Sequence, residues 1–255
     1  MKIKTSSGSH ETQREWVYHR IKLALMAGRY QPGEKITIAS LTESLKISAT
    51  PVREALRRLA AERALVMSPN RSVSVPALTR TEVLAVRAIR ERLEGYAARI
   101  AAGKIDRKRL VRLARIGREL AAARSRADAR RIMWLNEVFH FTVYEAAGIP
   151  VLTDIIATLW LQSAPTLSLV FRPESIGRYP ADVQNRNNRA LLATLRLRDG
   201  RGAERAVTAE IAAGSRLLQH LMDVAPSGSN PPPRARTSRT RPTPGGRARS
   251  TSAGR

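Results

Sequence analysis

The run from Ser48 to Leu59, Ser-Ala-Thr-Pro-Val-Arg-Glu-Ala-Leu-Arg-Arg-Leu, carries hydroxyl groups at its start and guanidinium groups beyond them. Its apolar residues recur at four- and three-residue spacing, namely Val52, Leu56 and Leu59. That spacing predicts a helix with one apolar stripe against a core. Arg53, Arg57 and Arg58 fall off the stripe, so the outer face suits phosphates and guanine edges in a DNA groove. The alternative is an ordinary amphipathic surface helix with a solvated basic face.

The start of this helix has its own signals. Ser48 is predicted to be the N-cap, its hydroxyl accepting a hydrogen bond from a free amide of the first turn. Pro51 is tolerated near a helix start, where its missing N–H would have no partner anyway. Ser48 and Thr50 therefore stand at the end of the helix that we expect to meet DNA first.

The segments before this helix predict a helix-turn-helix. A helix fits residues 11–27, with Gly28 placed to end it. Gln31 to Glu34 reads Gln-Pro-Gly-Glu, a turn signal. A second helix fits residues 39–45, and residues 46–47 form the turn before Ser48. Two short helices joined by about three residues, the second of them basic, are typical of a helix-turn-helix.

A hairpin is predicted after the basic helix, over residues 65–75. Val73 and Val75 alternate with serines, as in a half-buried strand, and Pro69-Asn70 marks a turn. Arg71 would lie near the tip of such a wing, where it could reach a neighbouring minor groove or the DNA backbone. The alternative is a plain hairpin that closes the small core, with Arg71 solvated.

Residues 79–223 have a helical pattern almost throughout and no strand signal. Helices are expected from Thr79 to about Ala102 and over about 106–126, 128–147, 150–171, 179–198 and 201–222. The first of them is expected to bury one stripe: Val83, Val86, Ile89, Leu93, Ala97 and Ile100. Short connections with Gly or Pro at the joints predict an all-helical antiparallel bundle. The fold class is therefore mainly α, a winged helix-turn-helix (11–78) followed by a bundle (79–223).

Charge is the strongest global signal. The chain of 255 residues carries a formal net charge of +24 with a pI near 11.6, which makes a polyanion the default partner. Residues 1–10 are expected to form a flexible tail. Residues 224–255 hold seven Arg and no acid, so the remainder is still +17. Their Pro, Gly, Ser and Arg content predicts disorder, as either a non-specific polyanion arm or an inert solvated tail.

Several function classes are disfavoured. The four His are scattered, there is no Cys, and no Gly-rich phosphate loop or Gly-x-Ser-x-Gly motif occurs, so we expect no enzyme. No apolar run is long enough for a membrane span, and the N-terminus lacks a secretory h-region, so a cytoplasmic protein is the simplest interpretation. A sequence-tolerant DNA-compacting protein, driven by net charge and the basic tail, remains the alternative to a specific regulator.

The stretch from Gly28 to Leu59, above all Thr50-Pro51-Val52-Arg53-Glu54-Ala55-Leu56, resembles the winged helix-turn-helix of GntR-family transcription regulators. That run is specific for the branch with a FadR-type (FCD) helical domain. Leu78 to Ala98 looks like the first helix of that domain, and Asn136 to Gly148 looks like its ligand-site helix. The resemblance covers roughly residues 11–222. It implies a homodimer that binds a two-fold double-stranded DNA operator and releases or grips it when a small carboxylic acid binds, and we expect a repressor.

The resemblance also implies an effector site, formed by Arg90, Asn136, His140, Asn188 and Glu210. Many relatives hold a divalent metal there with an Asp or Asn and three His; here Asn188 and Glu210 stand at two of the His positions. This set suits zinc or nickel poorly, because these metals prefer several imidazoles. If any metal binds, His140 with Asn136 would hold it. The alternatives are a satisfied core histidine for His140 and a salt bridge to Glu94 for Arg90.

The chain departs from the family pattern where DNA is read. Relatives usually have Arg at the position of Ala49, often Glu-Arg at Ile38-Ala39, and Gly at Ser72. Two arginines expected to contact DNA are therefore missing. Thr50 and Arg53 are left as the best readers of the operator, whose sequence should differ from those of typical relatives, or else affinity depends more on the basic tail.

Overall fold

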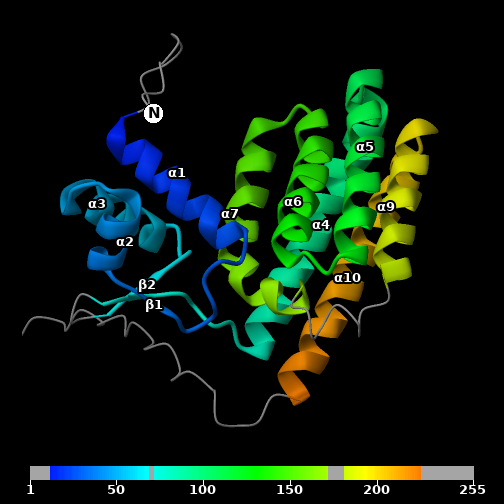
Figure 1. Cartoon of the computed structure of the whole chain (residues 1–255). Helices are drawn as coiled ribbons and strands as arrows, with labels where there is room; N and C mark the ends of the chain where they lie inside the picture. Colours follow the sequence, from blue (N-terminus) through cyan, green and yellow to red (C-terminus); the bar gives the residue numbers. More distant parts are fainter. Residues whose placement is uncertain (1–11, 69–71, 172–180, 225–255) are drawn as a thin grey trace, which may run out of the picture.

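The computed structural model of the chain describes residues 12–68, 72–171 and 181–224. The predicted N-terminal tail, the wing residue Arg71 and residues 225–255 of the predicted C-terminal tail lie outside them. Two bodies follow each other along the chain: a small domain with three helices and three short strands, and a helical bundle (Figure 1). The predicted fold class is confirmed.

The N-terminal domain contains α1 (Gln13–Met26), α2 (Ile38–Leu45) and α3 (Ala49–Ala61). Its strands are β1 (Lys35–Ile36), β2 (Val66–Met67) and β3 (Val73–Ser74). They form an antiparallel sheet in the order β1-β3-β2. The predicted hairpin is β2 and β3, and the predicted extended piece near Ile36 adds the third strand.

Local sequence explains most helix starts in this domain. Thr12 caps α1 with a capping box, since its hydroxyl accepts from the Glu15 amide while Glu15 bonds back to Thr12. Thr37 caps α2 through the Ser40 amide. Ser48 is the N-cap residue of α3, but the predicted side-chain bond is wrong, because its hydroxyl makes no capping hydrogen bond. Ser48 is instead exposed to solvent.

The bundle runs through α4 (Arg80–Lys104), α5 (Arg107–Ser125), α6 (Ala129–Ala146) and α7 (Pro150–Leu167). A 3-10 turn, η1 (Ser168–Phe171), follows α7, and α9 (Ala181–Arg196) and α10 (Gly200–Val224) complete it. The single helix expected over 150–171 is thus an α-helix followed by a tighter turn. Pro165, inside the last turn of α7, cannot donate a backbone hydrogen bond.

The buried face of α4 differs from the predicted stripe. Val83 and Ala97 are buried as expected, and three others are partly buried, but Ile89 is 48% exposed, so its placement in the stripe was wrong. The neighbouring Arg90 is buried instead, together with Glu94 one turn further on. The helix therefore turns a charged pair toward the interior, which an apolar periodicity cannot reveal. This helix packs along α10.

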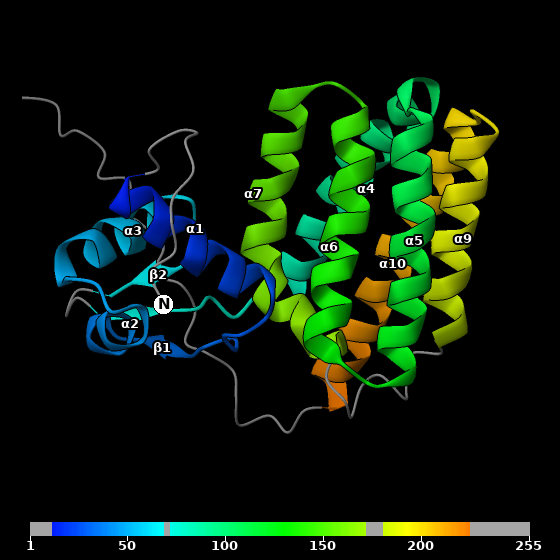
Figure 2. The ribbon, with the colours of Figure 1, turned by 45° about the horizontal axis from the view of Figure 1, so that its top comes forward.

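The two domains meet where α1 packs against α7 (Figure 2). Gln162 on α7 donates a hydrogen bond from Nε2 to the backbone carbonyl of Glu62, just after α3, at 2.8 Å. Gly28, after α1, adopts a left-handed φ of +63°, and a Cβ there would lie 2.5 Å from Cβ of Ser168 and 2.7 Å from Sδ of Met133. Only glycine allows this close approach.

Candidate functional site

The predicted DNA-facing helix is α3. Its apolar stripe is fully inside the domain, with Val52, Leu56 and Leu59 each no more than 1% exposed. Burial of these three branched side chains stabilises the packing of the helix by roughly 1.5–3 kcal/mol each. The opposite side of α3 therefore faces solvent.

On that solvent side Thr50, Arg53 and Arg57 are exposed, as is Ser48 at the N-cap. Within the described ranges, neither Arg53 nor Arg57 forms an ion pair. Both guanidiniums are thus available to phosphates or base edges, which is the property that a groove-reading helix needs. These four predicted DNA-contacting residues are thus all exposed at the start and along the outer side of α3, and Arg71 lies outside the described residues.

Arg58 is a different case, because it stabilises the domain itself. Its Nε lies 3.2 Å from Oε1 of Glu62, and its guanidinium stacks 3.8 Å from the ring centroid of Tyr18. The Tyr18 hydroxyl donates to the same carboxylate at 2.8 and 2.9 Å. Burial, reinforced by the Glu62 carboxylate, raises the pKa of Tyr18 to about 12. This cluster fastens α1 to the end of α3.

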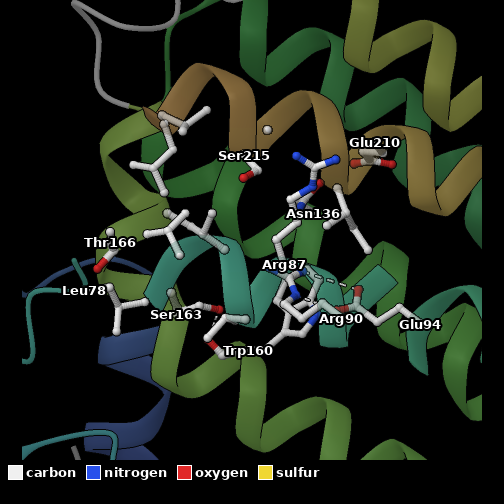
Figure 3. Close-up of a pocket in the computed structure, with 18 of the residues that line it drawn as sticks. Leu78, Arg87, Arg90, Glu94, Asn136, Trp160, Ser163, Thr166, Glu210 and Ser215 are labelled. Carbon is white, nitrogen blue, oxygen red and sulfur yellow. Dashed lines mark hydrogen bonds and ion pairs between the residues drawn. The ribbon is translucent and has the colours of Figure 1, made fainter. Parts of the chain in front are cut away.

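The second candidate site is a cavity of about 100 Å³ inside the bundle, walled by α4, α6, α7, η1 and α10 (Figure 3). On α10, Glu210 and Ser215 lie across it from Trp160, Ser163 and Thr166 on α7. Most of the wall is apolar, including Val83, Val86, Met133, Ala164, Leu167, Val170, Ile211 and Leu218. Four of the five predicted effector-site residues line it: Arg90, Asn136, His140 and Glu210.

The fifth, Asn188 on α9, does not line this cavity. It lines a separate groove beside α5, next to Arg118 and Leu192. Asn188 is only 5% exposed, and neither its amide oxygen nor its amide nitrogen has a hydrogen-bond partner in the described part of the chain. The structure thus brings together four members of the predicted set and leaves Asn188 outside the wall.

A continuous chain of hydrogen bonds crosses one end of the cavity. Arg90 donates from Nε to Oε1 of Glu94 at 2.5 Å and from Nη2 to Oε2 at 3.3 Å. The Tyr144 hydroxyl donates to Oε2 of Glu94 at 2.5 Å and lies 3.1 Å from Nδ1 of His140. Nε2 of His140 lies 3.0 Å from Oε1 of Glu210. Thus Arg90 forms the salt bridge that the sequence offered as its alternative role.

These hydrogen bonds surround His140 with acidic and hydroxyl groups. Burial is the largest influence on the pKa of His140 and lowers it, but the carboxylates of Glu210 and Glu94 together outweigh burial and raise the pKa overall. The surroundings of His140 therefore favour its protonated form, paired with Glu210.

These donors do not fit a metal ion. A histidine nitrogen must be unprotonated and free of other bonds to hold a metal, and both nitrogens of His140 already have hydrogen-bond partners. Across residues 12–68, 72–171 and 181–224, no three His, Cys, Asp or Glu side chains cluster as a metal site requires. The cavity is instead organised by its own salt bridges.

The sequence did not single out several residues of this region. Tyr144 had a usable signal, since it lies four residues after His140 and so on the same helix face. Trp160 and Thr166 on α7 had none. Met26 of α1 and Leu78 of the connecting segment also line the cavity, so the DNA-binding domain supplies part of the wall.

A winged helix-turn-helix with an exposed basic helix, joined to a helical bundle around a cavity, defines a ligand-responsive DNA-binding protein. Residues 13–75 match the family model "Bacterial regulatory proteins, gntR family", and residues 85–224 match the FCD domain. The chain therefore belongs to the GntR family, in its FCD branch. It is a transcription regulator with a DNA-binding GntR domain and an effector-binding FCD domain.

Individual relatives of the chain are also transcriptional regulators. The chain is 30% identical over 200 residues to the HTH-type transcriptional regulator McbR of Escherichia coli K12, spanning 78% of this chain and 89% of the relative. The solved structure of E. coli McbR/YncC matches with a TM-score of 0.71 at 25% identity, covering 84% and 96% of the two chains. A GntR regulator from Rhodococcus sp. RHA1 shares the fold, with a TM-score of 0.67 at 16% identity over 82% and 98%. Every helix within the described residues is too short or too polar to cross a membrane.

Proposed function

We propose that this regulator is a cytoplasmic repressor that binds a two-fold operator as a homodimer. Its affinity for the operator would change when a small organic molecule enters the bundle cavity. Residues 11–78 would bind DNA, and residues 79–223 would bind the effector and the second protomer. The outer face of α3 would read the operator through Thr50 and Arg53, while Ser48 and Arg57 would position it on phosphates.

The observation that carries the proposal is the mixed wall of the cavity. Met26, two residues before the close approach at Gly28, lines it beside Met133 of the bundle. A ligand in the cavity would touch α1 directly, and α1 packs on α3. A ligand can shift an equilibrium only through such differential contacts, and here it meets both domains at once.

The resemblance to relatives predicts a carboxylic acid as effector, with Arg90 as its partner. Against that assignment, Arg90 already donates two hydrogen bonds to Glu94. An uncharged ligand is therefore the competing class.

The test is selection of bound DNA from a random pool by the full-length protein, followed by titration at about 100 and about 300 mM salt. A repressor of this kind selects a two-fold sequence and keeps its preference at high salt, because base contacts do not depend on counterion release. Sedimentation of the complex should give two chains per site. Recovery of no consensus, with all sequences lost together as salt rises, would instead show a charge-driven DNA-compacting protein.

A further inference from the structure

We propose that the bundle cavity takes an uncharged, mostly apolar organic molecule with a hydrogen-bonding oxygen, and that it does so without a metal ion. This inference rests on the proposed role of the cavity as the effector site and names the chemical class of the effector.

Charge balance is the first argument. Three basic side chains line the cavity in the described structure, and each has its own carboxylate. Arg87 pairs with Glu91 at 2.7 Å, Arg90 pairs with Glu94, and His140 pairs with Glu210 at 3.0 Å. An incoming carboxylate would lose its hydration and find no uncompensated positive charge, while the carboxylates of Glu94 and Glu210 also line the cavity. An uncharged molecule avoids both costs.

Two neutral polar atoms in the cavity wall have no hydrogen-bond partner. Trp160 lines the cavity with Nε1 buried, and Thr166 lines it with Oγ1 buried, and neither atom has a hydrogen-bond partner among the described residues. A buried polar atom without a partner costs about 1–3 kcal/mol, so native proteins seldom retain one without a use. An indole N–H can only donate, whereas a hydroxyl can donate or accept. A carbonyl, ester or amide oxygen on the ligand could accept a hydrogen bond from either group.

Cavity size limits the ligand. A volume of about 100 Å³, in which each water centre takes roughly 10–15 Å³, has room for roughly seven to ten water molecules. That space suits an organic molecule of about seven to ten non-hydrogen atoms. The apolar wall would contact the hydrocarbon part, and the two neutral polar groups would contact the oxygen.

The metal-free part of the inference follows from His140. Both of its ring nitrogens already lie within hydrogen-bond distance of a protein group, Tyr144 at 3.1 Å and Glu210 at 3.0 Å, so a metal ion on either nitrogen would have to displace one of these partners. The buried carboxylate of Glu94 is likewise held by Arg90 and Tyr144. The polar side chains at this end of the cavity are thus held by one another, without a metal ion.

The test compares three probes that share a hexanoyl chain, namely hexanamide, methyl hexanoate and hexanoate, on the full-length protein near neutral pH. Labelling the tryptophans with ¹⁵N gives one indole N–H signal for each of the three Trp, and Trp160→Phe assigns the cavity signal. The uncharged probes should shift the Trp160 signal and bind about tenfold or more tightly than hexanoate. A parallel incubation with zinc, nickel or manganese salts, then dialysis and elemental analysis, should leave well under one ion per chain. Chelator should not change the affinity for hexanamide.

Matched variants link binding to the two atoms. Thr166→Val should weaken hexanamide binding about 3- to 10-fold, as expected for one neutral hydrogen bond. Thr158→Val is the control on the same helix, since the Thr158 hydroxyl bonds to the Asp154 carbonyl outside the cavity. For Trp160→Phe the control is Trp134→Phe, at an indole that is 44% exposed. Both controls should bind hexanamide like the unaltered protein.

Equal or tighter binding of hexanoate overturns the ligand class, and so does the absence of a Trp160 shift with either uncharged probe. One tightly held metal ion per chain that strengthens probe binding overturns the metal-free part. These outcomes would overturn only the proposed ligand class or the absence of a metal, and not the proposed function as a DNA-binding regulator. The operator selection described above needs no ligand, and only its failure to yield a specific sequence would count against the proposed function.

Discussion

Nε2 of Gln162, in the effector domain, lies 2.8 Å from the backbone carbonyl oxygen of Glu62, in the DNA-binding domain. Glu62 is the C-cap residue of α3, and its side chain also holds Tyr18 of α1. One residue therefore connects the cavity-lining helix α7 to both helices that place the DNA-facing surface. A movement of α7 would be transmitted to α3 through this hydrogen bond and through the packing of α1 on α7.

Gln162→Ala should lower the free energy of unfolding by about 1 kcal/mol, because a partly buried carbonyl is left without its hydrogen bond. Urea unfolding measures the change. The matched control is Gln219→Ala, which removes a hydrogen bond confined to α10. If the domains communicate through Gln162, only that variant should also alter the hydrogen exchange of the α3 C-terminal amides. Equal exchange in both variants would show that the bond is local.

Arg53→Ala should weaken operator binding by about 1–3 kcal/mol, or roughly 5- to 150-fold, and should relax sequence preference at the position it reads. The fold should be intact, because Arg53 is exposed and forms no ion pair within the described residues. Footprinting on the selected operator checks both effects. Arg112→Ala, at an exposed arginine of α5, is the control for loss of one positive charge. An unchanged footprint would refute the assignment of α3 as the reading helix.

The His140–Glu210 pair predicts a specific dependence of stability on pH. The folded-state pKa of His140 is raised above its ordinary value of about 6.5. The stabilisation from the pair is therefore complete below a pH of about 6.5 and is lost as pH rises through the folded-state pKa. Glu210→Gln, which leaves the buried imidazole without its counter-charge, should cost about 3–5 kcal/mol at low pH and less as the pH rises.

Urea unfolding of the two proteins at intervals between about pH 6 and about pH 9 measures this difference. Glu204→Gln is the control, because Glu204 on the same helix forms only an exposed pair with Arg99 at 3.7 Å. Its effect should be small, under about 1 kcal/mol, throughout the range. A constant penalty for Glu210→Gln across that range would mean that His140 is not protonated in the folded state.

Gly28→Ala should destabilise the protein by about 1–3 kcal/mol, since its left-handed backbone disfavours a side chain and the new Cβ would collide with Ser168 and Met133. Gly33→Ala separates the two causes. Gly33 has a φ of +81°, but no atom of the described residues lies within 4 Å of the position of its Cβ. The two variants should share the backbone penalty, and only Gly28→Ala should also disturb the packing between the domains. Thermal unfolding gives the stabilities, and equal losses of stability would show that the close approach is unimportant.

How far the sequence predicted the structure depends on the kind of signal. Periodic apolar residues and turn signals located the helices and strands closely, as α3 shows, because these patterns are local. Ile89 was misplaced because α4 buries Arg90 and Glu94, and a buried salt bridge does not follow apolar periodicity. The cavity wall combines Met26 with residues from several elements of the bundle, which only the three-dimensional packing brings together. Resemblance to a family placed Arg90, His140 and Glu210 in one site, and the four-residue spacing offered Glu94 as the partner of Arg90, but the partners of His140 were not predicted.

The basic segment after α10, residues 225–255, contains seven Arg and no acidic residue. If the segment binds DNA phosphates, its removal should make the slope of log affinity against log salt shallower. The change should be about 0.9 for each phosphate that the segment neutralises, and therefore at most about 6. The preferred operator sequence should not change, because phosphates carry no sequence information.

A variant of full length with the seven arginines replaced by glutamine is the control for charge as opposed to chain length. Both variants should show the same shallower slope. An unchanged slope in both would show that the segment is inert, and operator affinity would then have to come from α3 and the wing alone, despite the missing arginine at Ala49.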